Sequence, residues 1–143
     1  MQIYEVVDKD DHVTKLILPV YGKGLWSTMY GFLAIGNDLI TIEGITFYEH
    51  GETPGLGGEI DNPRWKAIWK GKKAFDDKGN VIIEVIKGIV DRTSPSSDHQ
   101  IDGLSGSTLT TRGVDYTIKY WLGEEGYGPY IDQLRKGTAN EEI

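Results

Sequence analysis

The sequence is 143 residues long, carries 22 acidic and 15 basic residues, and has a formal net charge of -7 at pH 7. Its length suits one domain with one hydrophobic core, and its hydrophobic share of 38% is too high for a disordered chain. Nucleic acid is an unexpected partner, because no run of Lys and Arg could follow a phosphate backbone. The absence of cysteine excludes disulfides, thiolate metal sites and cysteine nucleophiles, so redox chemistry requires a bound cofactor.

No segment of the sequence has the features of a membrane span or a secretory signal. The apolar stretches fall short of the roughly 18 residues that a span needs, and no basic, apolar and small-residue succession marks a signal peptide. The chain as given is therefore expected to be soluble. Its three histidines, His12, His50 and His99, lie in separate segments without metal-ligand spacing, so we expect no metal site.

The first third of the chain is expected to form two antiparallel strand pairs. Runs of strand-forming residues predict four strands, at residues 3–7, 13–20, 29–35 and 39–47. A polar turn separates the first two strands, and Gly36-Asn37-Asp38 separates the last two. Both connections are turn signals, so each pair should form a hairpin.

The middle of the chain is expected to contain a short helix and a fifth strand. Asn62 can cap a helix and Pro63 is favoured at its first position, which predicts a helix that ends at Gly71. Residues 81–90 are rich in β-branched side chains and predict a strand. A polar loop should follow over residues 91–107.

The last third of the chain is expected to be helical. Apolar residues recur at helical spacing from Leu109 onward, and Gly123 is a natural stop. A final helix should begin at Pro129 and end at Gly137. Together the elements predict an α+β fold, with a mainly antiparallel sheet flanked by a few helices, in a single domain over residues 1–143.

The segment Asp102-Gly103-Leu104-Ser105-Gly106-Ser107-Thr108 leads directly into the strongest predicted helix. Unpaired backbone N–H groups and the helix dipole form an anion site at such a start, so a phosphate would bind well here. The alternative is that Ser107 or Thr108 only caps the helix. A hydrolase nucleophile elbow does not fit, because G-x-S-x-G needs glycine where Ser107 stands.

A second candidate segment is Glu52-Thr53-Pro54-Gly55-Leu56-Gly57-Gly58. Its glycines and proline fix a compact loop whose backbone can approach a planar ligand closely, although a tight surface turn would have the same composition. Trp26 offers a broad apolar face for stacking on an aromatic ring, with core packing as the alternative. Both features would suit a flat aromatic ligand.

Other motifs in the sequence are better explained as turns. The acidic segments at residues 8–11 and 76–80 lack the ligand spacing of an EF-hand. Gly22-Lys23-Gly24 lacks the Walker arrangement of residues. Neither a calcium loop nor a nucleotide P-loop is therefore expected.

The two candidate segments resemble motifs of one known family. Residues 102–108 resemble its D-x-x-(S/T)-G-A-T flavinylation sequence, and residues 52–57 resemble its E-T-P-G-L-G loop. This is the FMN-binding domain family, which includes the C subunit of the sodium-translocating NADH:quinone reductase and the G subunit of the Rnf electron-transport complex. The segments 21–27 and 120–129 look like the reductase member. Ser107 departs from the pattern, which has Ala there, and places a second hydroxyl beside Thr108.

The resemblance implies that FMN is bound covalently. In the family, a separate transferase that uses FAD and a divalent metal attaches FMN to the last threonine of the motif through a phosphodiester bond, which makes Thr108 the acceptor. The resemblance further implies these cofactor-binding residues: Ser105, Gly106, Ser107 and Leu109 beside the acceptor, and Glu52, Thr53, Pro54, Gly55, Leu56, Gly57 and Trp26 around the ring. Thr110 lies past the motif and is expected not to matter.

The resemblance also implies a cellular setting. It implies an N-terminal membrane helix that this sequence does not contain, in the bacterial inner membrane, with the domain facing the periplasm. The other subunits of the reductase complex and the flavin transferase would be its partners. The domain would carry electrons within an NADH:quinone reductase that transports sodium, so the enzyme is the complex. No residue here would act as an acid, base or nucleophile toward a substrate.

Three other functions fit parts of the sequence. The Rnf member of the family shares the same motifs. A secreted ligand-binding module without flavin could use the 4 Trp and 8 Tyr as a stacking surface. A freestanding flavin reductase would have to bind NADH, but the sequence has no nicotinamide fingerprint.

Overall fold

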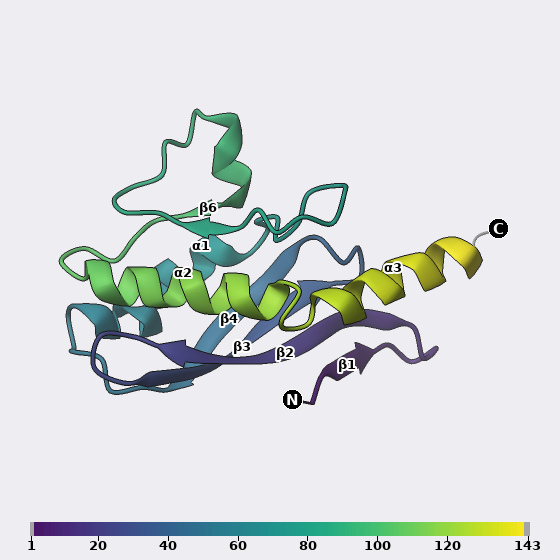
Figure 1. Cartoon of the computed structure of the whole chain (residues 1–143), viewed down its shortest axis with the longest axis horizontal. Coiled ribbons are helices and arrows are strands. Elements are labelled where there is room, and N and C mark those ends of the chain that lie inside the picture. Colours follow the sequence, from purple (N-terminus) through teal and green to yellow (C-terminus); the bar gives the residue numbers. More distant parts are fainter. Residues whose placement is uncertain (1, 142–143) are drawn as a thin grey trace.

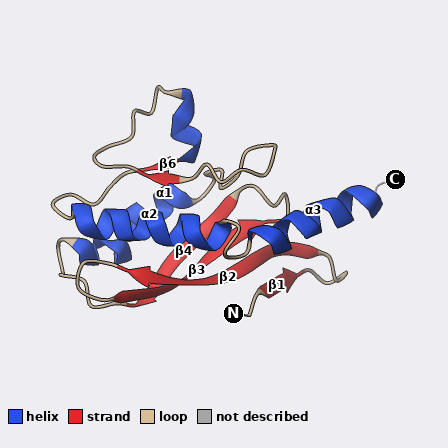
Figure 2. Ribbon diagram, in the orientation of Figure 1, coloured by secondary structure: helices blue, strands red, loops and turns tan. Residues whose placement is uncertain are grey.

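The computed structural model describes residues 2–141 and shows a four-stranded sheet with helices packed on one face (Figures 1 and 2). The strands follow one another in chain order as β1 Tyr4–Val7, β2 Val13–Lys23, β3 Thr28–Gly36 and β4 Ile42–Glu49. Each strand pairs antiparallel with the next. The predicted α+β class and both predicted hairpins are confirmed.

The start of β4 lies later than the sequence predicts. The predicted strand begins at residue 39, but Leu39 has a φ of 60° and belongs to the turn. The Asp38 carboxylate accepts the N–H groups of Ile40 and Thr41 at 2.9 and 2.8 Å. This side-chain turn holds apolar residues that composition alone assigns to a strand.

One face of the sheet supplies much of the hydrophobic core. Alternate side chains along β2 and β3 are buried, with Leu18 and Leu33 fully inaccessible, as the two-residue period of a strand requires. The helix α2, Thr108–Leu122, lies along this face (Figure 1) and buries Val114 and Ile118 in the same core. The predicted start of this helix near Leu109 and its stop at Gly123 are confirmed.

Two short helical elements follow β4 in the chain. They are the 3-10 helix η1, Gly57–Asp61, and the helix α1, Pro63–Trp69. Asn62 caps α1, because its side-chain oxygen accepts the N–H of Arg64 at 2.9 Å. The sequence predicts this start and places the end at Gly71, two residues beyond the last helical residue.

The predicted strand over residues 81–90 is wrong. Only β5, Glu84–Val85, is in strand conformation, and it pairs parallel with β6, Gln100–Ile101, outside the main sheet. The N–H of Val85 donates to the Asp115 carboxylate at 2.9 Å instead of to a neighbouring strand. Gly88 has a φ of 93° and turns the chain. This tertiary contact and the turn at Gly88 end the run despite its β-branched composition.

The predicted loop over residues 91–107 contains two short elements. One is the 3-10 helix η2, Pro95–His99, and the other is β6. Ser94 precedes η2 and its hydroxyl accepts the N–H of Ser96 at 3.2 Å. The remainder runs as loop to the start of α2.

The last helix is longer than the sequence predicts. Helix α3 spans Gly128–Glu141 and continues through Gly137, the predicted stop. Gly137 does not have the positive φ that a C-terminal glycine cap uses, so the helix is not interrupted. Arg135 attaches α3 to the core, because it donates to the carbonyl of Leu39 at 2.9 Å and lies 4.5 Å from the ring centroid of Phe75.

The described helices are short compared with a membrane span. The longest, α2, has 15 residues, and α3 has 14, whereas a spanning helix needs about 20 apolar residues. Within residues 2–141, no helix is both long and apolar enough to cross a membrane.

Candidate functional site

The two glycine-rich segments lie against each other at the start of α2. A Cβ atom added to Gly57 would lie 2.4 Å from Oγ1 of Thr110 and 3.2 Å from Oγ of Ser107. One added to Gly106 would lie 3.2 Å from Cδ2 of Leu56. A side chain at position 57 would displace these atoms, so glycine is what allows the close approach. The structure therefore brings together the two segments that the sequence singles out.

Thr108 is the first residue of α2, and it is half-buried. Ser107 occupies the N-cap position and is buried, yet its side chain makes no capping hydrogen bond. The plain side-chain cap that the sequence leaves open is therefore not formed by Ser107. The first N–H groups of this 15-residue helix keep their capacity to bind an anion.

Thr111 holds the loop in front of α2 in place. Its Oγ1 donates to the carbonyl of Ser107 at 2.8 Å and accepts the N–H of Leu104 at 3.0 Å. Trp65 of α1 adds a second anchor, because its Nε1 donates to the carbonyl of Asp102 at 2.9 Å. The loop is thus fixed by buried side chains at both of its ends.

Asp102, the first residue of the motif, fixes a neighbouring segment. Its carboxylate accepts the N–H of Val90 at 2.8 Å and pairs with the guanidinium of Arg92 at 2.9 Å. The N–H of Gly103 donates to the carbonyl of Gly88 at 2.8 Å. Residues 88–92 are in this way held beside residues 102–107, which are called the acceptor loop after the predicted acceptor Thr108 that follows them.

A hollow of about 380 Å³ opens between this segment and the acceptor loop. Its lining residues are Lys87, Gly88, Ile89, Gly103, Leu104, Ser105, Gly106 and Thr108. It combines glycine backbone, one lysine and the hydroxyl of the first helical residue, a set that suits a phosphate and its attached chain. Residues 87–89 are not predicted from the sequence, because nothing in their composition separates them from the apolar run around them.

Glu52 is the most heavily hydrogen-bonded side chain of the site. Its Oε1 accepts the N–H of Leu25 at 2.6 Å and the hydroxyl of Thr110 at 2.8 Å. Its Oε2 accepts the N–H of Trp26 at 3.0 Å and the hydroxyl of Ser27 at 2.8 Å. The carboxylate therefore connects three parts of the chain: its own loop, the turn between β2 and β3, and the first turn of α2.

The pKa of Glu52 reflects this environment. Burial acts to raise the pKa, but the hydrogen bonds from Ser27, Thr110, Leu25 and Trp26 together hold it below its usual value. Glu52 is therefore ionised at neutral pH, and a charged carboxylate accepts hydrogen bonds more strongly than a neutral one.

The residues predicted to bind FMN, beside the acceptor or around the ring, fall into two groups. Trp26 is 71% exposed, and Leu56 and Leu109 are 46% and 54% exposed, so these side chains can contact a bound molecule. Core packing of Trp26 is excluded. Glu52 is only 4% exposed and Gly57 is buried, so these two residues support the site from inside. The other exposed members are Thr53, Pro54, Gly55, Ser105 and Gly106.

Thr110 belongs to the site, although its place past the motif predicts no role. It is 1% exposed and donates to Glu52, which lies 58 positions away in the sequence. Thr110 therefore supports Glu52, while the expectation that it does not matter for flavin attachment stays a prediction. No local pattern could reveal this contact, because the partner lies in a different part of the chain.

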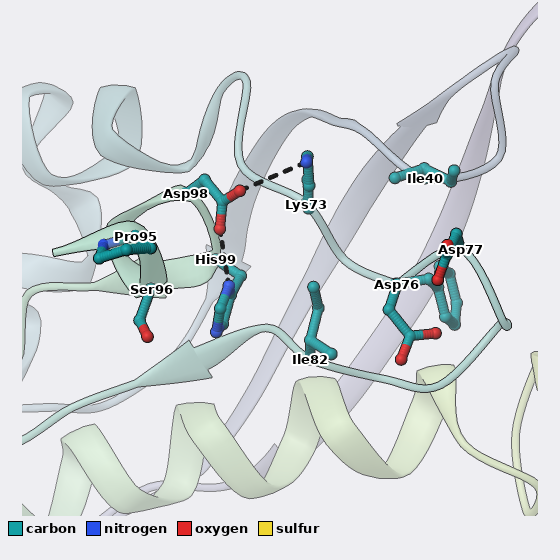
Figure 3. Close-up of a pocket in the computed structure, with 10 residues that line it drawn as sticks. Ile40, Lys73, Asp76, Asp77, Ile82, Pro95, Ser96, Asp98 and His99 are labelled. Carbon is teal, nitrogen blue, oxygen red and sulfur yellow. Dashed lines mark hydrogen bonds and ion pairs between the residues drawn. The ribbon is translucent and has the colours of Figure 1, made fainter.

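A separate hollow of about 490 Å³ lies beside η2 (Figure 3). Within it, Asp98 bridges Nζ of Lys73 at 3.3 Å and Nδ1 of His99 at 2.7 Å. The hydrogen bond from His99 is the main cause that lowers the pKa of Asp98. This hollow shares no lining residue with the Thr108 hollow.

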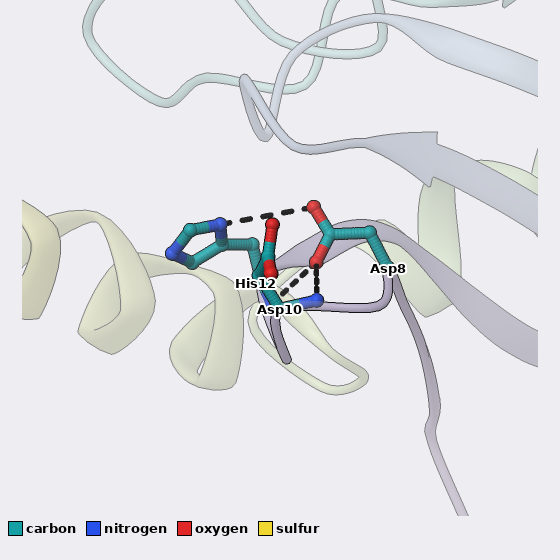
Figure 4. A group of neighbouring side chains, drawn as sticks. All are labelled: Asp8, Asp10 and His12. Atoms are coloured by element: carbon teal, nitrogen blue, oxygen red, sulfur yellow. Dashed lines mark hydrogen bonds and ion pairs between the residues drawn. The ribbon is translucent and has the colours of Figure 1, made fainter.

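The turn between β1 and β2 brings Asp8, Asp10 and His12 together (Figure 4). Their ligand atoms lie within 4.8 Å of one another, and all three residues are exposed. The Asp8 carboxylate accepts the N–H groups of Asp10 and His12 at 2.8 and 3.0 Å. These contacts are those of a side-chain-stabilised hairpin turn, as the sequence predicts for this segment.

The sequence profile of the FMN-binding domain family matches residues 24–123. The chain is 54% identical over 134 residues to the C subunit of the Na(+)-translocating NADH-quinone reductase of Pseudomonas aeruginosa, and 50% identical over 138 residues to that of Yersinia pestis. These matches cover 94% and 96% of the chain but 51% of each relative. The chain thus spans about half the length of the curated relatives it matches.

Two crystal structures resemble the fold described above. Shewanella oneidensis NqrC matches with a TM-score of 0.84 and 41% sequence identity, over 94% of this chain and 60% of that chain. The C subunit of the Na(+)-translocating NADH-quinone reductase from Parabacteroides distasonis matches with a TM-score of 0.67 and 37% identity, over 82% of this chain and 56% of that chain. The similarity therefore extends over most of the described fold.

Proposed function

Because the chain belongs to the FMN-binding domain family, we propose that it carries FMN on Oγ1 of Thr108 through a phosphodiester bond. The observation that supports this most directly is the place of Thr108. It is the first residue of α2, where Ser107 leaves the N–H groups without a side-chain cap, and it lines a hollow of about 380 Å³. An anionic phosphate is stabilised by both the N–H groups and the helix dipole.

In this proposal, a separate flavin transferase supplies the FMN from FAD. The oxygen of Thr108 forms a bond to the flavin-side phosphorus, the pyrophosphate bond of FAD breaks, and AMP and the hydroxyl proton leave. The backbone of Ser105, Gly106 and Ser107 then holds the phosphate, and Lys87 lines the same hollow with a positive charge. The bound FMN would supply the redox chemistry, and the chain would fix its position and surroundings.

The flavin ring is proposed to lie on the exposed side of the site. Trp26 and Leu109 offer accessible apolar surface there, and the exposed residues 53–56 form the adjoining loop. Trp is well suited to stack on a flat aromatic ring. This arrangement would leave one edge of the flavin accessible to an electron donor or acceptor.

The domain is proposed to work as an electron carrier in a sodium-translocating NADH:quinone reductase. The two named relatives support this assignment over the Rnf member of the family, because both are the C subunit of that reductase. Its partners would be the other subunits of the complex and the flavin transferase. The proposed location is the periplasmic side of the bacterial inner membrane.

Co-expression with a flavin transferase tests the attachment site. The wild-type chain should gain the mass of FMN less one water and remain fluorescent in a denaturing gel, whereas Thr108→Ala should do neither. Thr14→Ala is a matched control, since Thr14 is exposed on β2 and lies outside the site. A folded Thr108→Ala protein that still gains the flavin mass, for example on Ser107, would overturn the assignment. A colourless wild-type protein would favour a binding module without flavin.

A further inference from the structure

We propose that Glu52 is a positioning residue, which holds the turn between β2 and β3, the turn that carries Trp26, against the first turn of α2. In this proposal Glu52 does not contact the flavin. The inference deepens the proposed function, because its consequence for the ring rests on FMN attachment at Thr108. The locking itself concerns the chain alone and can be tested without the cofactor.

The Glu52 carboxylate is fully occupied by the protein. An ionised carboxylate has about four acceptor positions, and Glu52 receives four hydrogen bonds, two on each oxygen. The residue is also only 4% exposed. No acceptor position is left for a bound molecule. Glu52 is therefore not one of the residues that contact the flavin ring, and its role is to hold other parts of the chain.

The segments that Glu52 connects approach each other closely. A Cβ atom added to Gly24 would lie 2.2 Å from Oε1 of Glu52, and one added to Gly113 would lie 2.2 Å from the carbonyl oxygen of Lys23. Both glycines let the turn after β2 lie directly on α2. The carboxylate fills the space between the turn and the helix, so its position sets the distance between them.

The backbone at Glu52 is itself held by hydrogen bonds to side chains. His50 Nδ1 accepts the N–H of Glu52 at 3.1 Å, and His50 Nε2 lies 2.7 Å from the carboxylate of Asp61. Ser27, which donates to the Glu52 carboxylate, also accepts the N–H of Gly51 at 2.8 Å. The side chain therefore leaves an anchored backbone, which makes it a rigid connection.

The side chain that depends most on this connection is Trp26. It is 71% exposed, so core packing does not fix it. Its backbone N–H donates to Glu52, and the neighbouring Leu25 N–H does the same. The direction in which Trp26 projects is thus set by the turn, and the turn is set by Glu52.

The first experiment measures amide hydrogen exchange in the cofactor-free chain. Glu52→Gln keeps the shape of the side chain but replaces one acceptor oxygen by a donor. Exchange at the Leu25 or Trp26 amide should accelerate about tenfold, because a hydrogen bond to a charged group is lost. Glu59→Gln is the matched control, since no hydrogen bond to the Glu59 carboxylate occurs among residues 2–141 and exchange at both amides should stay unchanged.

The second experiment measures flavin fluorescence in the loaded chain. In the proposed arrangement Trp26 stacks on the flavin ring and should quench its fluorescence. Glu52→Gln should still gain the flavin mass at Thr108, but this quenching should weaken. Trp26→Phe should weaken it as well, and the double variant should show no further change, because Glu52 acts through Trp26. Additive effects would overturn the positioning role. If the wild-type chain gains no flavin mass, the proposed function fails, while the exchange result still decides whether Glu52 locks the turn.

Ser27→Ala keeps the test decisive if Glu52→Gln does not fold. This variant removes one donor to Glu52 and the acceptor of the Gly51 N–H, and it leaves the carboxylate in place. Exchange at the Trp26 amide should rise, by less than in Glu52→Gln. Unchanged exchange at both amides in a folded Glu52→Gln or Ser27→Ala protein would refute the proposal.

Discussion

The two ends of α2 are attached to the sheet by different chemistry. At its start, Thr110 donates to the buried carboxylate of Glu52, which also binds the turn after β2. At its end, Nε1 of Trp121 donates to the carbonyl of Tyr21 at 2.8 Å, and the hydroxyl of Tyr127 donates to β2 as well. The start is a polar connection beside the half-buried Thr108, and the end is an aromatic cluster.

The aromatic end of α2 covers a free strand edge. β1 pairs with β2 only up to Ile17, so beyond it the β2 carbonyl groups that point away from β3 have no strand partner. The carbonyls of Pro19 and Tyr21 instead accept hydrogen bonds from Tyr127 and Trp121, and Pro19 has no N–H group to leave unpaired. Covered edges do not recruit other strands. This end therefore contributes to stability, while the other end holds the candidate site.

The largest expected effect concerns Tyr127 at alkaline pH. Burial, and secondarily Tyr21, raises the pKa of Tyr127 to about 12, whereas an unfolded tyrosine titrates near pH 10. Below pH 10 the phenol is neutral in both states and the stability is fully present. Between pH 10 and 12 the unfolded chain loses this proton first, so the free energy of unfolding should fall by up to roughly 2.7 kcal/mol.

Denaturant titrations of wild type and Tyr127→Phe from pH 7 to 12 check this loss. The phenylalanine variant should be less stable by about 1 kcal/mol at pH 7, because one hydrogen bond is missing. The difference between the two proteins should then shrink and reverse as pH rises to 12. The pH dependence that does not involve Tyr127 is common to both proteins and cancels in the difference. A constant difference over this range would contradict a buried, neutral Tyr127.

A smaller loss of stability, coupled to the site, is expected from Thr111→Val. The substitution leaves the N–H of Leu104 without its acceptor in a buried position, which should cost about 2 kcal/mol in the free energy of unfolding. The acceptor loop should also loosen, so FMN attachment at Thr108 should slow. Both quantities can be measured on the same preparation, by denaturant titration and by intact mass over time.

Thr117→Val is the matched control on the same helix. Thr117 is equally buried, but its hydroxyl donates to the carbonyl of Gly113 within α2. Its loss should leave the attachment rate unchanged. If Thr111→Val and wild type attach FMN at equal rates, the start of α2 does not hold the site, and the proposed difference between the two ends of the helix is wrong.

The sequence predicts the elements of this fold where local rules decide them. The hairpins of β1 to β4 follow from strand runs separated by turn residues, and Asn62 with Pro63 marks the start of α1. The same rules fail for residues 81–90. There the Asp115 carboxylate accepts a backbone N–H group and the positive φ of Gly88 turns the chain, so no long strand forms. Composition reports what a segment prefers and contains no information on a side chain 30 positions away.

The candidate site shows the same division. Its motif segments, residues 52–57 and 102–108, are visible in the sequence because glycine and small polar residues cluster there. The roles of Thr110 and Lys87 cannot be predicted from the sequence. Thr110 belongs to the site through its hydrogen bond to Glu52, and Lys87 reaches the hollow only because the chain turns at Gly88. Both contributions arise from tertiary approach, which no spacing rule describes.

The smallest expected effect concerns Lys87, which is exposed and lines the hollow beside Thr108. A lysine at this place should attract the incoming phosphate without forming a buried pair, so its contribution should be about 0.5–1 kcal/mol. Lys87→Met should therefore slow the initial rate of FMN attachment by roughly 2–5-fold. Lys70→Met removes the same charge from an exposed position outside the hollow and should leave the rate unchanged. Because exposed charges are screened by salt, the difference between the two variants should disappear at about 1 M salt. A Lys87→Met protein that is flavinylated at the wild-type rate in low salt would confine the phosphate site to the backbone of the acceptor loop and the start of α2.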